Sequence, residues 1–419
     1  MIEELPLLDP KSVSSCSKDL AKGPWEWSGN KAGYGPGASS TDPLPPFYPS
    51  QESIPSKYRE AEPALLEAWI TEARTKLDEK VVILGHYYQR EEVIRHSDYL
   101  GDSYLLSVAA TRHPRADYIV FCGVHFMAET ADILSQPHQQ VILPNIEAGC
   151  SMADMADPES IDRCWKHLMS VFGPQEGDDN VTPIIPVTYM NSSAELKAFC
   201  GQRGGIVCTS SNADKVLTWA FERGKRVLFF PDQHLGRNTG LKMGFDLDEL
   251  PLWNRRKASG GLSDAQLLNS KIILWDGFCS VHKRFRVDQI ELARKNNPQV
   301  RVIVHPECPM EVVQAADESG STEFILNTIR NAPVPTAFAV GTEISMVRHL
   351  ALKFPQHEIT CLDPVVCPCS TMYRIHPSYL AWVLEELAEG RTVNQITVPS
   401  DIIQDASIAL NRMLEATQN

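Results

Sequence analysis

The chain has 419 residues, longer than most single domains, so two or three domains are expected. Apolar residues make up 43% and charged residues 22% of the chain, which is the composition of a globular protein. The formal net charge of −14 disfavours a nucleic-acid partner or an anionic membrane, because both bind basic surfaces, but a small anionic substrate can still occupy a locally positive site.

Targeting signals and cysteine content indicate the compartment. No apolar run approaches the roughly 20 residues of a membrane span, and the first ten residues lack the basic start and long apolar stretch of a secretory signal. We therefore expect a cytoplasmic protein with no membrane partner. In a reducing compartment the eleven cysteines should be mostly thiols, and those with a function are more often metal ligands than disulfides.

The N-terminal residues 1–55 are rich in Gly, Pro and Ser and show no periodicity. This pattern predicts a flexible N-terminal tail, in which Cys16 has no expected role. Residues 54–79 follow, with apolar residues at helical spacing, and predict one or two helices.

Short β-branched and apolar runs then alternate with helical stretches, which is the pattern of parallel sheets in an α/β protein. Their continuous apolar character fits strands that are buried on both faces. The runs fall into three sets: 80–89, 117–123 and 139–145; 182–192, 204–210, 225–233 and 271–277; and 300–308, 335–343 and 357–364.

The first and third sets share their internal spacing. Each has a polar residue ending the opening strand, a hydroxyl residue 17 positions later and a cysteine 64 positions later: His86, Ser103 and Cys150 in the first, and His305, Thr322 and Cys369 in the third. The same order of residue types in both sets indicates an internal repeat.

The middle set follows the same order with a longer span, from Tyr189 through Ser210 to Cys279. It is longer by 26 residues, which the loop-like segment 239–264 can hold. We therefore predict an α/β fold of three pseudo-symmetric repeats, each a small parallel sheet flanked by helices, that meet at a central active site. The expected boundaries are 1–55 for the tail, 56–165, 166–295 and 296–375 for the three repeats, and 376–419 for C-terminal helices.

Functional residues of parallel sheets lie beyond the carboxyl ends of the strands. Three repeats around a threefold axis could bring Cys150, Cys279 and Cys369 together at one centre. Three thiolates with a fourth position open would suit an iron-sulfur cluster with one iron free for substrate, or zinc with an exchangeable water.

Other readings of the cysteines are possible. The pair Cys367 and Cys369 could be a redox pair, although a Cys-x-Cys loop is short and strained as a disulfide. Cys308 lies close to the expected chemistry. Four further cysteines lie in strand-like or helical stretches and are expected in the core: Cys122, Cys164, Cys200 and Cys208.

Pairs of polar residues two positions apart end the opening strand of each set, and alternate residues share one side of an extended segment. Any one of these histidines could be a buried side chain bonded to backbone. Their equivalent places in the three repeats favour a site instead. The pairs are His86 and Tyr88, Tyr189 and Asn191, and His305 and Glu307.

Hydroxyl residues precede apparent helices at 209–215 and 320–324, where they could be helix caps or part of an anion site. The basic run His282–Arg286 lies beside Cys279, although such a run is usually a solvated face.

Eleven motifs in this order resemble the quinolinate synthase family, and the likeness covers about residues 60 to 390: GHYYQ, GDS, EAGCSMADM, TYMNS, CTSSNA, PDQHLG, WDGFCSVH, HPEC, GSTEF, GTE and CPCSTMYRI. The resemblance implies condensation of iminosuccinate with dihydroxyacetone phosphate to quinolinate, phosphate and water in NAD biosynthesis. It also implies one 4Fe-4S cluster per chain, held by one cysteine from each domain. An aspartate-oxidising enzyme is the expected source of iminosuccinate.

The resemblance carries over to individual residues by motif. Cys150 and Cys279 are implied as cluster ligands. For the third ligand the CP element alone aligns Cys367, whereas the repeat spacing selects Cys369, which we predict. Tyr88, Glu307 and His305 are the implied proton-transfer groups. The implied substrate contacts are His86, Ser103, Tyr189, Asn191, Ser210, His305, Glu307 and Thr322.

Two alternatives use the same residues. One is another 4Fe-4S hydro-lyase, which would act on a hydroxy acid without condensation. The other is a non-catalytic iron-sulfur redox sensor. Turnover of iminosuccinate and the triose phosphate distinguishes all three.

Overall fold

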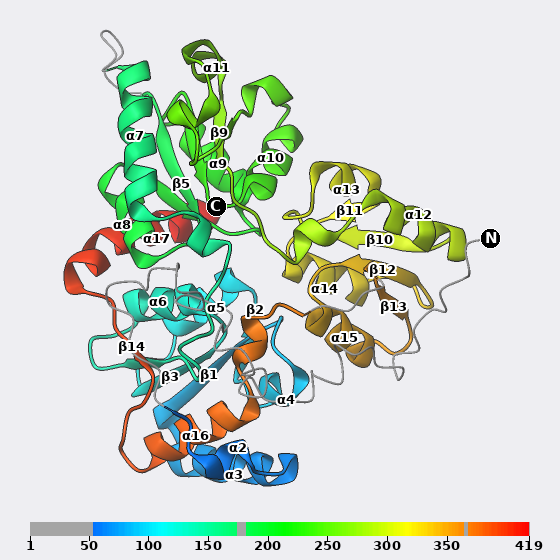
Figure 1. Cartoon of the computed structure of the whole chain (residues 1–419). Coiled ribbons are helices and arrows are strands. Elements are labelled where there is room, and N and C mark those ends of the chain that lie inside the picture. The colour runs from blue at the N-terminus through cyan, green and yellow to red at the C-terminus, as the bar shows by residue number, and fades with distance from the viewer. Residues whose placement is uncertain (1–52, 174–181, 364–367, 419) are drawn as a thin grey trace.

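A computed structural model describes residues 53–173, 182–363 and 368–418 (Figure 1). Most of the predicted N-terminal tail, with Cys16, lies outside the described residues, and so does Cys367. Ile54, which we assigned to the tail, is buried in the hydrophobic core with 7% of its surface exposed.

The chain forms three separate sheets, and each of them contains at least one short edge strand that we did not predict. The first sheet has the order β14-β4-β3-β1-β2, with β14 antiparallel and the others parallel. Its strands are β1 (Val81–His86), β2 (Tyr99–Gly101), β3 (Tyr118–Cys122), β4 (Gln140–Ile142) and β14 (Gln395–Ile396).

The second and third sheets are parallel throughout, with orders β6-β5-β7-β9-β8 and β11-β10-β12-β13. The strands of the second sheet are β5 (Ile185–Tyr189), β6 (Ile206–Cys208), β7 (Val227–Phe230), β8 (Leu252–Trp253) and β9 (Ile272–Trp275). Those of the third are β10 (Arg301–Val304), β11 (Glu318–Ser319), β12 (Ala337–Gly341) and β13 (Glu358–Cys361).

All three sheets share one connectivity. In each, the opening strand lies between the second strand on one side and the third strand on the other, and the last parallel strand of the repeat follows outward; the order is β2-β1-β3-β4, β6-β5-β7-β9 and β11-β10-β12-β13. The predicted fold class, three α/β repeats with small parallel sheets, is confirmed. Segment 239–264 supplies the extra edge strand β8 and two 3-10 turns, η4 (Leu247–Glu249) and η5 (Ala258–Gly261).

Helices flank the sheets and connect their strands. Residues 54–79 form two helices, as predicted, and a 3-10 turn follows them, η2 (Asp78–Lys80). The helices are α2 (Ser56–Arg59), α3 (Pro63–Leu77), α4 (Glu91–Ile94), α5 (Ser103–Ala110), α6 (His125–Leu134), α7 (Pro158–Phe172), α8 (Ala194–Gln202), α9 (Ala213–Phe221), α10 (Gln233–Lys242), α11 (Asp264–Asn269), α12 (Val287–Asn296), α13 (Met310–Ala315), α14 (Thr322–Arg330), α15 (Ile344–Lys353), α16 (Pro377–Ala388) and α17 (Ser400–Gln418).

The C-terminal helices tie the first two repeats together. Helix α16 packs on α3, and α17 packs on α8 and β6 of the second repeat while also contacting α6 of the first (Figure 1). Both repeats consequently share one continuous hydrophobic core, whereas the third repeat has two small cores on the two faces of its sheet. The predicted boundary at 165 falls inside α7, and the domain limits stay predictions.

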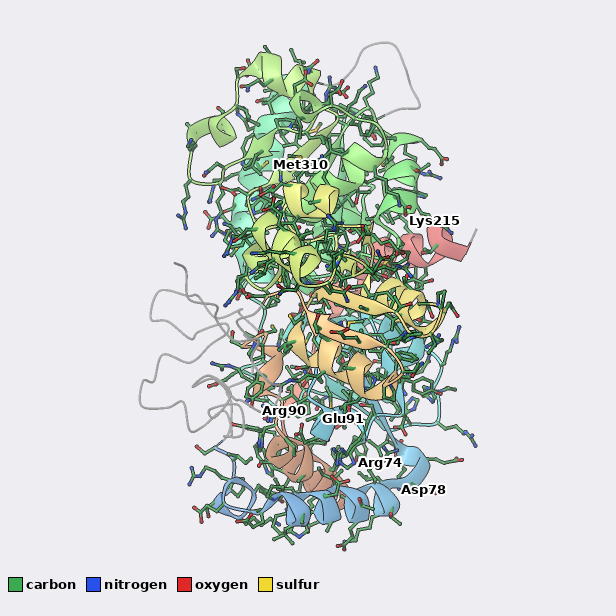
Figure 2. All side chains as sticks on the ribbon, turned by 90° about the vertical axis from the view of Figure 1, so that its right-hand side faces the viewer. Arg74, Asp78, Arg90, Glu91, Lys215 and Met310 are labelled. Carbon is green, nitrogen blue, oxygen red and sulfur yellow. The ribbon has the colours of Figure 1, made fainter. Side chains whose placement is uncertain are left out.

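The third repeat is fastened to the first by polar contacts. Glu91 on α4 pairs with His349 on α15 at 3.1 Å, and the Tyr87 hydroxyl donates to Glu323 at 2.9 Å. Figure 2 shows Arg90 and Glu91 between α3 and the third repeat. These contacts bring the carboxyl ends of β1 and β10 toward one another.

Among the described residues, no helix is both long enough and apolar enough to cross a membrane.

Candidate active site

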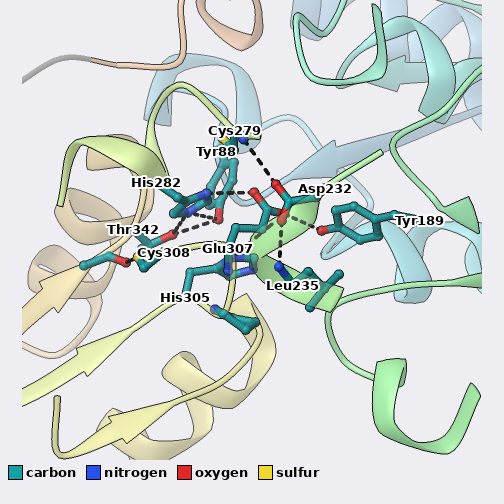
Figure 3. Close-up of polar contacts among 12 residues, drawn as sticks. Tyr88, Tyr189, Asp232, Leu235, Cys279, His282, His305, Glu307, Cys308 and Thr342 are labelled. Carbon is teal, nitrogen blue, oxygen red and sulfur yellow. Dashed lines mark hydrogen bonds and ion pairs between the residues drawn. The ribbon is translucent and has the colours of Figure 1, made fainter. Parts of the chain in front are cut away.

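One cavity lies where the carboxyl ends of the three sheets meet, and every site residue predicted from the sequence lines it. These residues come from all three repeats: His86, Tyr88, Ser103, Cys150, Tyr189, Asn191, Ser210, Cys279, His305, Glu307, Thr322 and Cys369. Figure 3 shows the polar contacts at its centre. The threefold arrangement therefore brings together residues that are far apart in the sequence.

Each of the three cysteines begins the same local turn. A 3-10 helix starts three residues after each cysteine: η3 (Ala153–Met155), η6 (His282–Arg284) and η7 (Met372–Arg374). In each turn the N–H four residues on donates to the cysteine carbonyl: Asp154 to Cys150 at 3.1 Å, Lys283 to Cys279 at 3.0 Å and Tyr373 to Cys369 at 2.9 Å. The N–H at the start of each 3-10 helix lowers the pKa of the thiol, in opposition to burial: Ala153 for Cys150, His282 for Cys279 and Met372 for Cys369. The turn that follows Cys369 therefore has the same hydrogen bond as the turns that follow Cys150 and Cys279.

The three thiols are close enough to interact electrostatically. Burial raises the pKa of Cys150, Cys279 and Cys369, and Cys279 also interacts with Glu307 and with the other two thiols. All three are free thiols. Three converging thiols are soft ligands that face one centre, as a metal site requires. A bound cation would stabilise their thiolate forms.

Glu307 is the centre of the polar network. It is 3% exposed, and its two carboxylate oxygens bind the Tyr189 hydroxyl at 2.6 Å and His282 Nδ1 at 2.8 Å. Burial opposes its ionisation, but the nearby His282 and His305 and the two hydrogen bonds outweigh burial and lower the pKa of Glu307. Glu307 is therefore a carboxylate at neutral pH.

Tyr88 reaches the same network from the first repeat. Its hydroxyl lies 2.7 Å from Thr342 Oγ1 and 3.4 Å from His282 Nε2. Burial and the Glu307 charge raise the pKa of Tyr88 well above its usual value, so its phenol stays protonated. Burial lowers the pKa of His86 and that of His305 to about 3, so both imidazoles are neutral.

Hydroxyl and amide groups face the cavity without internal partners. Among the described residues, Asn191 Oδ1 and Thr322 Oγ1 are buried and have no hydrogen-bond partner. Thr322 is not the cap of α14, because Ser321 fills that role; likewise Asp102, not Ser103, caps α5. Capping therefore does not explain the hydroxyls of Thr322 and Ser103 in the cavity. The unpartnered Thr322 hydroxyl is available to a ligand.

The sequence analysis did not assign two residues of the site. It noted His282 beside Cys279 in a basic run of the kind that usually faces solvent, but His282 is 1% exposed, whereas its neighbours Lys283 and Arg284 are exposed. The reason is that η6 turns His282 inward, where its ring stacks on His305 with centroids 4.4 Å apart. Thr342, from the GTE motif, was also not assigned; its place directly after β12 was the available signal.

The site can hold a metal ion. A second possible ligand set shares Cys279 with the three thiols: the ligand atoms of Cys279, His282 and Glu307 lie within 4.8 Å of one another. The four cysteines expected in the core, Cys122, Cys164, Cys200 and Cys208, are fully buried there, and Cys308 lies in a core of the third repeat. Both soft and mixed ligand sets are compatible with a metal cofactor.

Comparison with known proteins agrees with this geometry. The family model described as Quinolinate synthetase A protein matches residues 69–415. A protein of Corynebacterium glutamicum named quinolinate synthase is 60% identical over 381 residues, covering 91% of this chain and 95% of that protein. Relatives with the same name in Rhodopirellula baltica and Geobacillus kaustophilus are each 48% identical, over 90% and 87% of this chain and 95% and 96% of their own.

Proposed function

We propose, for this chain of the quinolinate synthetase A family, that it condenses iminosuccinate with dihydroxyacetone phosphate using a 4Fe-4S cluster on Cys150, Cys279 and Cys369. The family membership makes the chain an enzyme of quinolinate synthesis for NAD. The products are quinolinate, phosphate and water. The protein acts on small molecules, and an aspartate-oxidising enzyme would supply the iminosuccinate. We place it in the cytoplasm, where both substrates would be available.

One observation carries the cluster proposal: three cysteines, one from each repeat, adopt the same turn and face one cavity. A 4Fe-4S cluster held by these three thiolates would keep one iron open, and it would supply a Lewis acid for a substrate oxygen or nitrogen. The equivalence of the turns supports Cys369 as the third ligand.

Other residues around the cavity would bind the substrates. Asn191 and Thr322 have buried polar atoms without partners, and with Ser103 and Ser210 they would bind substrate carboxylate and phosphate oxygens. The first N–H groups of α5 and α14 lie beside two of these hydroxyls, and helix N-termini favour anions. His86 would donate a further hydrogen bond in its neutral form.

Proton transfer would use groups that stay in defined protonation states. Glu307 Oε1 or Oε2 would accept a proton as the carbonyl compound enolises, and Tyr88 Oη would donate one to a departing oxygen. His282 contacts both residues and Thr342, so it can hold the two groups in register. His305, stacked on His282, would orient the substrate and assist the transfer.

Anaerobic purification tests the proposal. Iron and sulfide are measured in the wild-type protein and in Cys150→Ala, Cys279→Ala, Cys369→Ala and Cys367→Ala, and each is then incubated with iminosuccinate and dihydroxyacetone phosphate. We expect about four irons in the wild type and in Cys367→Ala, with quinolinate formed by both. Loss of the cluster from Cys367→Ala with retention in Cys369→Ala would reverse the ligand assignment.

The same experiment separates the alternatives. A cluster that forms without any quinolinate, but dehydrates a hydroxy acid, would indicate a hydro-lyase. A cluster without turnover of either kind would indicate a redox sensor. Absence of iron and sulfide from the wild type would overturn the cluster itself.

A further inference from the structure

Two buried carboxylates occupy equivalent positions in the second and third repeats. Asp232 follows β7 and is the N-cap of α10, and Glu343 follows β12 and is the N-cap of α15. Asp232 is 0% exposed and Glu343 is 1% exposed. Neither residue is part of the proposed ligand set or of the proposed proton-transfer groups.

Each carboxylate binds two backbone segments. Asp232 Oδ1 accepts from the Leu235 N–H of its own helix at 2.7 Å, and Oδ2 accepts from the Cys279 N–H at 3.2 Å. Glu343 Oε2 accepts from the Ser345 N–H at 2.6 Å, and Oε1 accepts from the Cys369 N–H at 3.1 Å. In each side chain, one oxygen accepts from a helix N–H and the other accepts from the cysteine N–H, and Glu343 Oε1 also accepts from the Ser345 hydroxyl at 3.4 Å.

The first repeat has a different solution. Its corresponding residue is Val124, which has no carboxylate, and α6 has no side-chain cap. The His125 N–H of α6 donates to Ala148 O at 2.8 Å, two residues before Cys150. The Gln233 N–H makes the same contact with Gly277 O at 2.9 Å, two residues before Cys279, so the backbone contact is shared and the carboxylate is an addition.

Helix capping alone does not account for these carboxylates. Ser193 and Ser321 cap α8 and α14 with a hydroxyl, so capping a helix of this fold does not require a carboxyl group. A glutamate is also an unusual N-cap, because its longer side chain must fold back to reach the first turn. The second bond, to the cysteine N–H, is what distinguishes Asp232 and Glu343 from the other caps.

We propose that Asp232 and Glu343 are positioning residues that fix the backbones of Cys279 and Cys369 so that both thiolates point at the metal centre. They would act on the cluster through the cysteine loops, as hydrogen-bonded outer residues do in other metal sites. The proposal rests on the proposed cluster, and its test is built to tell the two apart.

Variants can separate the two bonds of each carboxylate. Asp232→Ser keeps a hydroxyl for the Leu235 N–H but cannot also reach the Cys279 N–H. Glu343→Gln keeps the side-chain length but has only one acceptor oxygen for the two segments. Asp157→Ala is the control, because Asp157 caps α7 through Ser160 at 2.8 Å and holds no cysteine.

The first measurement is cluster retention under anaerobic conditions. After reconstitution, release of iron to a chelator should be about 10 to 100 times faster in Asp232→Ser and in Glu343→Gln than in the wild type, and unchanged in Asp157→Ala. The electron paramagnetic resonance spectrum of the reduced cluster should also change in the two variants alone, since it reports on ligand geometry.

The second measurement needs no cluster. Amide hydrogen exchange of the apo-protein should be about tenfold faster in the fragment containing Cys279 for Asp232→Ser, and in that containing Cys369 for Glu343→Gln, with distant fragments unchanged. A general loss of stability would instead accelerate exchange throughout the chain and would count against the proposal.

The outcomes distinguish the two ideas. Wild-type protein with a full cluster, and variants that match Asp157→Ala in iron release and in local exchange, would overturn the positioning role and leave the cluster standing. Wild-type protein without iron and sulfide would overturn the proposed cluster and the positioning role with it.

Discussion

The exchange Glu307→Gln tests the centre of the site most directly. It preserves the volume of the side chain but removes the charge that binds Tyr189 at 2.6 Å and His282 at 2.8 Å. A hydrogen bond to an ionised group contributes about 1.5–3 kcal/mol and a neutral one about 0.5–1.5 kcal/mol, so the two bonds together should weaken by about 2–3 kcal/mol. If Glu307 also accepts a proton, the rate should fall by a further factor of about 10²–10⁴.

Stability and catalysis should both decrease. The neighbouring histidines and the two hydrogen bonds outweigh burial and lower the pKa of Glu307, so its ionised form is favoured in the folded state at neutral pH. We therefore expect the melting temperature of the apo-protein at pH 7 to fall, while kcat for quinolinate formation falls by at least about 100-fold. Iron and sulfide should remain at the wild-type level, because Glu307 is not a proposed ligand.

The assay measures quinolinate formed from iminosuccinate and dihydroxyacetone phosphate without oxygen, normalised to iron content. Glu311→Gln is the matched control, since Glu311 is exposed on α13, four residues along the chain. A Glu307→Gln rate within about threefold of the wild type at equal iron content would refute the role assigned to this carboxylate.

Three further changes follow from the structure. Tyr88→Phe keeps the ring and deletes the hydroxyl, so quinolinate formation should fall by about 10²–10⁴-fold with the cluster retained, and an unchanged rate would exclude Tyr88 as a proton donor. Burial raises the pKa of Asp132 to about 6, so the ionised form is less favourable in the folded state and its contribution to stability declines as pH rises from about 4 to about 6. Asp132→Asn can still accept the Val398 N–H, and should raise the apo-protein melting temperature at pH 8 but not at pH 4; an equal effect at both would contradict this. In Gly277→Ala the new Cβ would lie 2.3 Å from Pro231 O, so we expect a lower melting temperature and less bound iron, whereas normal values would show that the loop adjusts freely.

The sequence alone was sufficient to predict the longer buried strands and the polar residues at their ends. Strands with continuous apolar runs, such as β1, β7 and β12, were identified because each is buried and at least four residues long. The polar residues that end the opening strands were found for the same reason, since the end of such a run marks the edge of a sheet.

Four short strands with partly exposed side chains were not recognised. Strands β2, β8, β11 and β14 have two or three residues each and include partly exposed side chains. Such segments have no periodic pattern of their own and become strands only because a longer neighbour offers backbone partners. The pairing of β14 with β4 joins segments more than 250 residues apart.

Local composition was misleading at His282. The run His282–Arg286 is basic, and a basic run usually faces solvent, yet one member turns inward while its neighbours remain exposed. In a 3-10 turn successive side chains point in different directions. The charges along the sequence therefore could not show that His282 is buried while Lys283 is exposed.

The chain order by itself determined the three repeats, the residue types at their strand ends and the equal spacing that selected Cys369 over Cys367. It did so because equivalent elements of the first and third repeats span the same number of residues, so equivalent side chains recur at the same spacing in the sequence. Only the tertiary structure decided which groups meet: Asp232 reaches Cys279 across 47 residues and Tyr88 reaches Thr342 across 254. Such contacts depend on how three sheets pack around one centre, and packing leaves no local trace in the sequence.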